Sequence, residues 1–174
     1  MKRPVLSILA ASAIAGGILS AASSAAMADV KIYAAASCRV PIISNAIVNA
    51  NGVVFNNSLT VGLSISCPIV RDHPSLKPTS VQVSVVDNSS LLVGSGNVSC
   101  RVVAANRFGT FVSSGAQAST NGTNSAGTIL NLAIPATNFV DGAYMVNCTI
   151  PRRGAGDPNS SVASIKVTEA IASP

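Results

Sequence analysis

Residues 59–67 have the sequence LTVGLSISC, in which apolar side chains alternate with small or polar ones. Successive side chains of a β-strand point to opposite faces, so this alternation places every second residue on the same face. The stretch therefore predicts a strand with one buried and one exposed face. The predicted inward-facing residues are Leu59, Val61, Leu63, Ile65 and Cys67.

The same two-residue period recurs in residues 79–86, 97–104 and 143–150. The predicted inward-facing residues are Val81, Val83 and Val85 in the first segment, Val98, Cys100, Val102 and Ala104 in the second, and Tyr144, Val146, Cys148 and Ile150 in the third. Weaker strand candidates lie at 30–36, 46–56 (interrupted by the turn dipeptide Asn51-Gly52), 107–113, 128–134 and 162–169.

Turn-forming segments separate these candidates, and no window of useful length shows a helical stripe. A Gly/Ser turn at 94–97 and a Gly/Pro loop at 151–159 are two of the separators. Residues 115–127, GAQASTNGTNSAG, are too polar for a core and are predicted to form a flexible loop. We therefore predict an all-β fold in which about eight to ten short strands form one antiparallel β-sandwich, immunoglobulin-like or jelly-roll.

The first residues predict an export signal. Lys2 and Arg3 precede an apolar stretch from Val5 to about Leu19, and Ala26-Met27-Ala28 is an A-x-A cleavage pattern. We expect residues 1–28 to be a cleaved signal peptide and residues 29–174 to be a single domain that is secreted, periplasmic or on the cell surface. A retained membrane anchor is the alternative, because residues 5–28 carry no charge and are just long enough to span a bilayer.

Four cysteines in an exported chain favour two disulfides, for which three pairings exist. Cys67, Cys100 and Cys148 all fall on the apolar faces of their predicted strands, where a bridge is buried. We favour Cys38–Cys67, which ties the entering segment to the first clear strand, and Cys100–Cys148, which joins two core strands. A zinc site is disfavoured because the chain has no C-x-x-C and a single histidine.

The sequence lacks the patterns of an enzyme active site. His73 is the only histidine, and the adjacent Asp72 is poorly placed to orient its ring in a Ser–His–Asp relay. No G-x-S-x-G or cofactor-binding motif occurs. We therefore predict a non-enzymatic protein without catalytic, cofactor-binding or metal-ligating residues. A hydrolase with paired carboxylates from distant strands is the least favoured alternative.

The composition of the chain indicates which classes of ligand to expect. The net charge is +5, but the basic residues are scattered, so a nucleic-acid partner is not expected. The chain has four Phe, two Tyr and no Trp, and this scarcity of aromatic platforms weighs against a carbohydrate-binding module. Oxygen-rich segments at 87–88, 141–142 and 157–159 match calcium-binding chemistry, but they match ordinary turns equally well.

Two loop clusters carry enough charge to contact a partner. Arg71, Asp72 and His73 form one, and Arg152 with Arg153 forms the other. Loops on a rigid sandwich are a usual place for binding, so these five residues are the predicted interaction loops. Arg71 and Asp72 are also predicted to form an ion pair that anchors their loop.

Two resemblances accompany these patterns. Asp141-Gly142-Ala143-Tyr144 ahead of Cys148 resembles the Asp–Ala–Tyr–Cys run of immunoglobulin strand F, with the Tyr four residues before the Cys instead of two. The chain also resembles small secreted proteins of environmental proteobacteria that have no assigned activity. That resemblance implies the architecture and no functional residue, and it rests on the series Cys38, Asn57-Ser58, Cys67-Pro68, Arg71-Asp72, Val81-x-Val83-x-Val85-x-Asp87, Cys100, Tyr144, Cys148-x-Ile150-Pro151 and Val167-x-Glu169.

Two non-enzymatic roles follow from these patterns. The favoured one is a secreted module that binds a protein, a glycan or a surface through its loops. The alternative is a pilin-like subunit that polymerises at the cell surface by adding a strand to an open sheet edge. The alternating Val30, Ile32 and Ala34 support the second role, but the nine residues from Asp29 to Ser37 are few for a donated strand.

Overall fold

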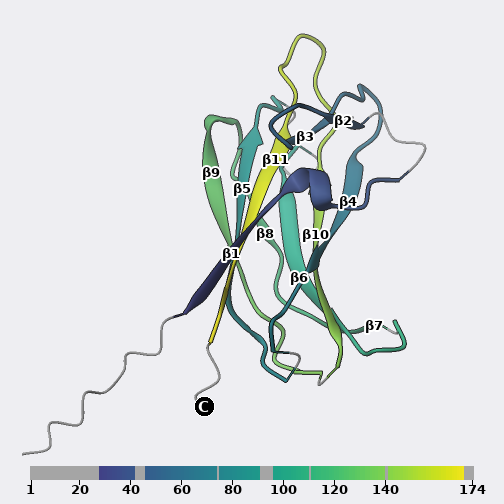
Figure 1. Ribbon diagram of the computed structural model, residues 1–174. Coiled ribbons are helices and arrows are strands. Elements are labelled where there is room, and N and C mark those ends of the chain that lie inside the picture. Colours follow the sequence, from purple (N-terminus) through teal and green to yellow (C-terminus); the bar gives the residue numbers. More distant parts are fainter. Residues whose placement is uncertain are drawn as a thin grey trace, which may run out of the picture.

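The computed structural model describes residues 28–41, 46–73, 75–90, 96–109, 111–139 and 141–170. The predicted signal peptide, apart from its last residue, lies outside them, as do the first two residues of the turn at 94–97. Two antiparallel sheets face each other (Figure 1), so the predicted all-β sandwich is confirmed. No helix in the described part of the chain is long and apolar enough to cross a membrane.

The first sheet, called the β11 sheet, has the strand order β2-β3-β11-β5-β9, and β1 also pairs with β11. Its strands are β1 (Asp29–Ala34), β2 (Ala46–Val48), β3 (Val54–Asn56), β5 (Pro78–Asp87), β9 (Asn124–Leu132) and β11 (Ser161–Glu169). The second, called the β10 sheet, has the order β4-β10-β6-β7, and β8 also pairs with β6. Its strands are β4 (Leu63–Ile69), β6 (Ser99–Ala105), β7 (Phe111–Ser114), β8 (Ala118–Ser119) and β10 (Ala143–Ile150).

The core lies between the two sheets and consists mainly of β-branched side chains. Val81, Val83 and Val85 of β5 are buried on one side, and Val102 of β6 and Val146 of β10 are buried on the other. The burial of alternate residues that the sequence predicted is thus confirmed for 79–86, 97–104 and 143–150. Removal of these apolar surfaces from water is the main force that holds the sheets together.

The start of the first predicted strand differs from expectation. Leu59 and Val61 are 48% and 58% exposed, and β4 begins only at Leu63. The Ser58 hydroxyl accepts hydrogen bonds from the N–H groups of Thr60 (3.2 Å) and Val61 (3.0 Å). These local side-chain bonds fold residues 58–61 into a turn and compete with the strand conformation that the alternation predicted.

The prediction of a flexible loop at 115–127 is wrong in part. Ala118 and Ser119 form β8, whose residues pair with Cys100 and Ser99 of β6, and β9 already begins at Asn124. Between these strands Thr120 is only 5% exposed, and its N–H donates to the Val98 carbonyl at 2.9 Å. Pairing with distant β6 therefore orders residues whose local composition favours a loop.

The N-terminal segment connects the two sheets. β1 pairs along its whole length with β11, and the short 3-10 helix η1 (Ala35–Ser37) then brings the chain to β4. There Arg39 forms an antiparallel bridge with Ser66. The Tyr33 hydroxyl also spans the gap between the sheets, since it donates to the Val70 carbonyl beyond β4 at 2.9 Å. The segment thus closes one open side of the sandwich (Figure 1).

Both predicted disulfides are confirmed. Cys38–Cys67 ties the segment after η1 to β4, and Cys100–Cys148 joins directly opposite residues of β6 and β10. All four cysteines are buried. The bridges close loops of 29 and 48 residues, for which the chain-entropy model gives about 3.5–4 kcal/mol of stabilisation each.

Candidate functional site

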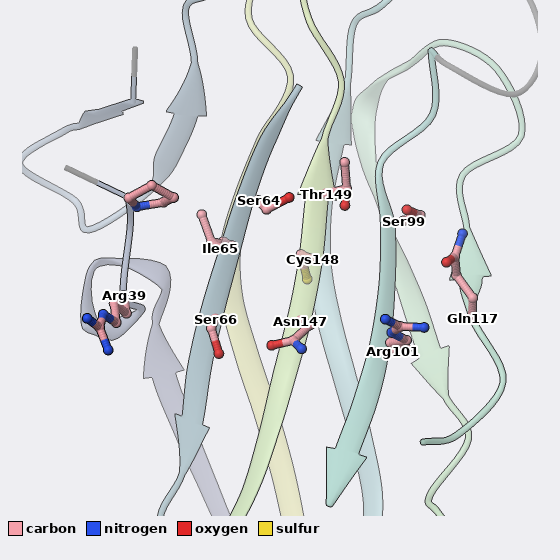
Figure 2. Close-up of a pocket in the computed structure, with 11 residues that line it drawn as sticks. Arg39, Ser64, Ile65, Ser66, Ser99, Arg101, Gln117, Asn147, Cys148 and Thr149 are labelled. Carbon is pink, nitrogen blue, oxygen red and sulfur yellow. The ribbon is translucent and has the colours of Figure 1, made fainter. Parts of the chain in front are cut away.

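A row of polar and basic residues crosses the outer face of the β10 sheet. Asn147 on β10 lies opposite Ser66 of β4 on one side and opposite Arg101 of β6 on the other. The row continues past Ser66 to its bridge partner Arg39. It therefore runs Arg39, Ser66, Asn147, Arg101, as Figure 2 shows.

A second polar row lies beside the first. Thr149 of β10 is opposite Ser64 of β4 and Ser99 of β6, and Ser99 is in turn opposite Ser119 of β8. Both rows face outward because the residues between them, such as Ile65 and Cys148, point into the core. Strand alternation thus places apolar side chains below the sheet and hydroxyl and amide groups above it.

These rows form the floor of a groove of about 610 Å³, within the roughly 300–1,000 Å³ of small-ligand sites. Its hydroxyl and amide groups come from Ser64, Ser66, Ser99, Gln117, Asn147 and Thr149. Arg39 borders it on one side, and Arg101 and Gln117 on the other (Figure 2), and Pro41 also lines it. No aromatic side chain is among the described residues that line it.

The groove is electropositive. Arg39 and Arg101 are both exposed, and neither takes part in an ion pair within the described residues, where every salt bridge involves Lys31. None of the described residues that line the groove carries a carboxylate. Two guanidinium groups over a sheet, with no acid beside them, attract anionic groups.

Asn147 lies in the middle of the groove floor and holds an unsatisfied acceptor. Its Oδ1 atom is buried and accepts no hydrogen bond from the described residues. A buried acceptor without a donor costs about 1–3 kcal/mol. The terminal torsion of an asparagine is broad, so a modest rotation turns this oxygen toward a donor that enters the groove.

The predicted interaction residue Arg71 is used by the fold. Its guanidinium donates to the Leu76 carbonyl at 2.7 Å and to the Gly142 carbonyl, and it lies 4.8 Å from the ring centroid of Tyr144. The expected ion pair between Arg71 and Asp72 is wrong, because Asp72 instead pairs with Lys31 at 2.6 Å. His73 is exposed, and its carbonyl accepts a bond from Leu76 N–H at 3.0 Å.

Arg152 and Arg153 follow the end of β10, at the opposite end of the sandwich from residues 71–73. The Arg152 guanidinium donates to the Leu59 carbonyl at 3.2 Å, and Arg153 N–H donates to the Ser58 carbonyl at 2.9 Å. They follow β10, whereas residues 71–73 follow its antiparallel neighbour β4. The five predicted loop residues therefore form two separate groups, and a partner-binding role for either group stays a prediction.

An acidic cluster that sequence reasoning missed lies at the end of β1. One carboxylate oxygen each of Asp29, Asp72 and Glu169 lies within 4.8 Å of the other two. The Lys31 ammonium is 2.6 Å from Asp72, 3.6 Å from Asp29 and 3.7 Å from Glu169. The position that would suit a metal ion is thus taken by an ammonium, and the cluster is a network of ion pairs.

The charges in this cluster change the proton affinities of its members. The hydrogen bond from Lys31, followed by one with Asp29, holds the pKa of Asp72 below its ordinary 3.8. Burial by itself lowers the pKa of Lys31, but the hydrogen bond to Asp72 and the charges of Glu169 and Asp72 outweigh that effect and raise it above 10.5. Both charged forms are therefore favoured in the folded state.

The oxygen-rich segments considered for calcium use two of their carboxylates within the fold. Asp87 is fully buried and accepts hydrogen bonds from Ser89 N–H, Val98 N–H, the Ser160 hydroxyl (3.1 Å each) and the Thr120 hydroxyl. Asp157 accepts two bonds from Ser90 and one from Gly154, and the bond from Ser90 N–H is the main reason that its pKa is lowered. Both carboxylates hold turns together.

The groove residues were not among those singled out from the sequence. The signal that carries them is the outward half of the alternating strands, which in β4 and β10 consists mostly of Ser, Thr and Asn. Arg101 also lies within a strand, so its exposed charge is not explained by a position in a solvated loop. The predicted interaction residues were all in loops, so neither feature was recognised from the sequence.

Comparisons with known proteins give a likeness at low identity. No family model and no curated protein matches the chain. Among solved structures it is similar to a family two carbohydrate esterase from Cellvibrio japonicus, with 14% identity and a TM-score of 0.47, over 85% of this chain and 36% of that one. It is also similar to the family 11 carbohydrate-binding module of a cellulosomal cellulase from Clostridium thermocellum, with 9% identity and a TM-score of 0.42, over 83% of this chain and 89% of that one.

A third similar structure is a Cry1Da tryptic core variant from Bacillus thuringiensis, with 12% identity and a TM-score of 0.43, over 82% of this chain and 24% of that one. The chain therefore spans well under half of the esterase and of the Cry1Da core. At these values no activity or ligand is transferred from any of the three proteins.

Proposed function

We propose that the chain is an exported, non-enzymatic β-sandwich module that binds a glycan in the groove on the outer face of the β10 sheet. The observation that carries the proposal is the groove floor, where two rows of hydroxyl and amide groups surround the unsatisfied Oδ1 atom of Asn147. Sugar hydroxyls both donate and accept hydrogen bonds, so they match such a lining, and a single hydroxyl supplies the donor that Asn147 lacks.

The shape of the site supports a chain-like ligand. The groove crosses three neighbouring strands, β4, β10 and β6, and its two rows are set by strand register. A rigid sheet holds these side chains in place before the ligand arrives, which lowers the entropic cost of binding.

The scarcity of aromatic residues weighs against a carbohydrate-binding role. It also determines which interactions can bind a sugar in this groove. Among the described residues that line the groove, no aromatic side chain offers a platform for a sugar ring. The affinity has to come from hydrogen bonds and from the two arginines. We therefore expect a binding mode that is more sensitive to the ligand's hydroxyl groups and charge than to its apolar ring faces.

The proposal of a non-enzymatic role rests on the same residues. The groove offers Ser, Thr, Asn, Gln and Arg, which bind well but are poor proton carriers near neutral pH. His73 follows β4 in the loop with Asp72, whose carboxylate pairs with Lys31. This arrangement supports binding without turnover.

The polymerising subunit is less well supported. Strand donation needs an N-terminal strand that is free to enter another molecule. Here β1 pairs from Asp29 to Ala34 with β11 of the same chain, and Cys38 is cross-linked to β4. Both contacts favour a self-contained module, for which light scattering of the native protein is expected to give a monomer.

The experiment is affinity gel electrophoresis of the oxidised protein against a panel of neutral and acidic polysaccharides. At least one polysaccharide is expected to retard the wild type. Asn147→Ala is expected to weaken that retardation about fivefold, the effect of about 1 kcal/mol for one hydrogen bond. Asn131→Ala is the matched control, because Asn131 is exposed on the outer face of the other sheet. Retardation by no polysaccharide, or equal losses in both variants, contradicts the proposal.

A further inference from the structure

We infer that the glycan bound by the groove is acidic, with carboxylate or sulfate groups that contact Arg39 and Arg101. This inference rests on the proposed glycan-binding function and adds the chemical class of the ligand. The first observation is the distribution of charge. None of the chain's six acidic residues lines the groove, and each is placed elsewhere: Asp29, Asp72 and Glu169 around Lys31, Asp87 and Asp157 in hydrogen-bonded turns, and Asp141 in the turn before β10.

The second observation is that neither guanidinium group is held by an ion pair or hydrogen bond to any residue that the structure describes. Arg71 and Arg152 donate to backbone carbonyls, and so help to hold loops. The side chains of Arg39 and Arg101 are exposed and form no ion pair with a described residue. Their donors are therefore available to a ligand without breaking an existing contact, and a planar guanidinium suits the paired oxygens of a carboxylate or sulfate.

The third observation is the spacing. Arg39, Ser66, Asn147 and Arg101 follow one another across four adjacent chain segments. Three inter-strand steps separate the backbones of the two arginines by about 14 Å. One small anion contacts both only if the two side chains turn inward toward each other. A polymer with repeated negative charges contacts both without that rearrangement, and this favours a polysaccharide over a monosaccharide.

The fourth observation excludes a polyanion that carries no hydrogen-bond donor. Asn147 lies between the arginines with an unsatisfied acceptor, and it needs a hydrogen-bond donor. A carboxylate or sulfate oxygen only accepts, so it does not satisfy this atom. The two requirements are met together by a chain that carries both hydroxyl and acidic groups, as an acidic polysaccharide does.

The experiment compares pairs of polymers that share a sugar backbone, of which one member is charged and the other neutral. Polygalacturonate is tested against its fully methyl-esterified form, and dextran sulfate against dextran, in low salt by isothermal titration calorimetry. At least one acidic form is expected to bind at least tenfold more tightly than its neutral partner, and its affinity is expected to fall as NaCl is raised. The first pair detects a carboxylate and the second a sulfate ligand. Polyglutamate is included as a polyanion without sugar hydroxyls.

Three variants test which residues contact the acidic ligand. Arg101→Gln is expected to weaken binding of the acidic form at least tenfold and of the neutral form less than twofold. Asn147→Asp keeps an acceptor but adds a negative charge, so it is expected to lose the acidic ligand and to retain the neutral one. Lys166→Gln removes an exposed positive charge from the outer face of the β11 sheet and is expected to change neither affinity more than twofold. Thermal melts confirm that all three variants fold.

The outcomes separate this inference from the proposed function. Equal binding of the charged and the neutral polymer in both pairs overturns the inference that the ligand is acidic and leaves glycan binding in place. Binding of polyglutamate as tight as that of the acidic polysaccharide also overturns it, because the interaction is then one of charge alone. An effect of Lys166→Gln as large as that of Arg101→Gln overturns the placement in the groove. Failure of every polysaccharide to bind overturns the proposed function itself.

Discussion

Arg39 and Arg101 lie at the two ends of one row of cross-strand neighbours, although 61 residues separate them in the sequence. Ser66 and Asn147 lie between them, and the row forms part of the groove floor (Figure 2). The Cys38–Cys67 disulfide is next to this row on one side, since it joins the residue before Arg39 to the residue after Ser66. The bridge therefore fixes the segment that carries Arg39 against the edge of β4.

We expect the protein to be exported, to begin at Asp29 after cleavage and to contain two disulfides. Its N-terminal residue should be Asp29, and its intact mass should rise by the mass of four hydrogen atoms on full reduction, because all four cysteines are paired. Peptide mapping without reduction should recover Cys38 linked to Cys67 and Cys100 linked to Cys148. A mature chain that retains Lys2 and Arg3 contradicts the cleavage, and free thiols in native protein contradict the bridges.

Asp87→Ala is expected to destabilise the fold by about 3–4 kcal/mol, because it leaves several buried donors without an acceptor. Asp87 is fully buried and accepts bonds from the backbones of Ser89 and Val98 and from two hydroxyl groups. Urea denaturation measures the loss. Asp141→Asn is the control: Asp141 is exposed with a φ of 62°, which asparagine adopts readily, so less than about 0.5 kcal/mol is expected.

Lys31→Met is expected to destabilise the protein at neutral pH, and the deficit should shrink as the pH falls. In the wild type the folded-state pKa of Asp72 is lowered from 3.8, mainly by its hydrogen bond with Lys31. The stability that this provides is therefore fully present above pH 3.8 and is lost as the pH falls through the lower folded-state value. In the variant three carboxylates face one another without an ammonium, and protonation relieves their repulsion.

Thermal unfolding from pH 6 to pH 2 tests this dependence. The difference in Tm between wild type and Lys31→Met should narrow over this range, whereas Lys166→Met should differ little from wild type throughout, because Lys166 is exposed on the outer face of β11. A constant difference for Lys31→Met would show that the cluster acts through packing and not through charge.

Tyr144→Phe is expected to cost about 1 kcal/mol, since it removes one partly buried hydroxyl. That hydroxyl is 3.3 Å from the Thr137 carbonyl and 3.2 Å from Asn138 Oδ1, just upstream of β10. Such a bond from the start of a strand back to the preceding turn resembles the tyrosine corner of immunoglobulin domains. Tyr33→Phe is the comparison, and its more exposed bond to Val70 should contribute less. Equal losses by urea denaturation would count against a special role for Tyr144.

The inner faces of the main strands were determined by the sequence itself. Val81, Val83 and Val85 are buried as their alternation predicted, and Cys100 and Cys148 face the core beside each other. The reason is that the direction of a side chain in a strand depends on local backbone geometry, and a period of two residues records it without knowledge of the neighbours. The same local argument failed at Leu59 and Val61, where bonds to the Ser58 hydroxyl make a turn.

The groove was decided by the tertiary structure alone. Arg39, Ser66, Asn147 and Arg101 come from four separate segments, and each taken singly is an ordinary outward-facing residue. Which strands become neighbours, and in which register, depends on long-range hydrogen bonding that no local pattern encodes. The same pairing placed Asp87 in the interior and Lys31 among three carboxylates. The alternation determined which way each side chain points, and the packing of distant strands decided which side chains meet.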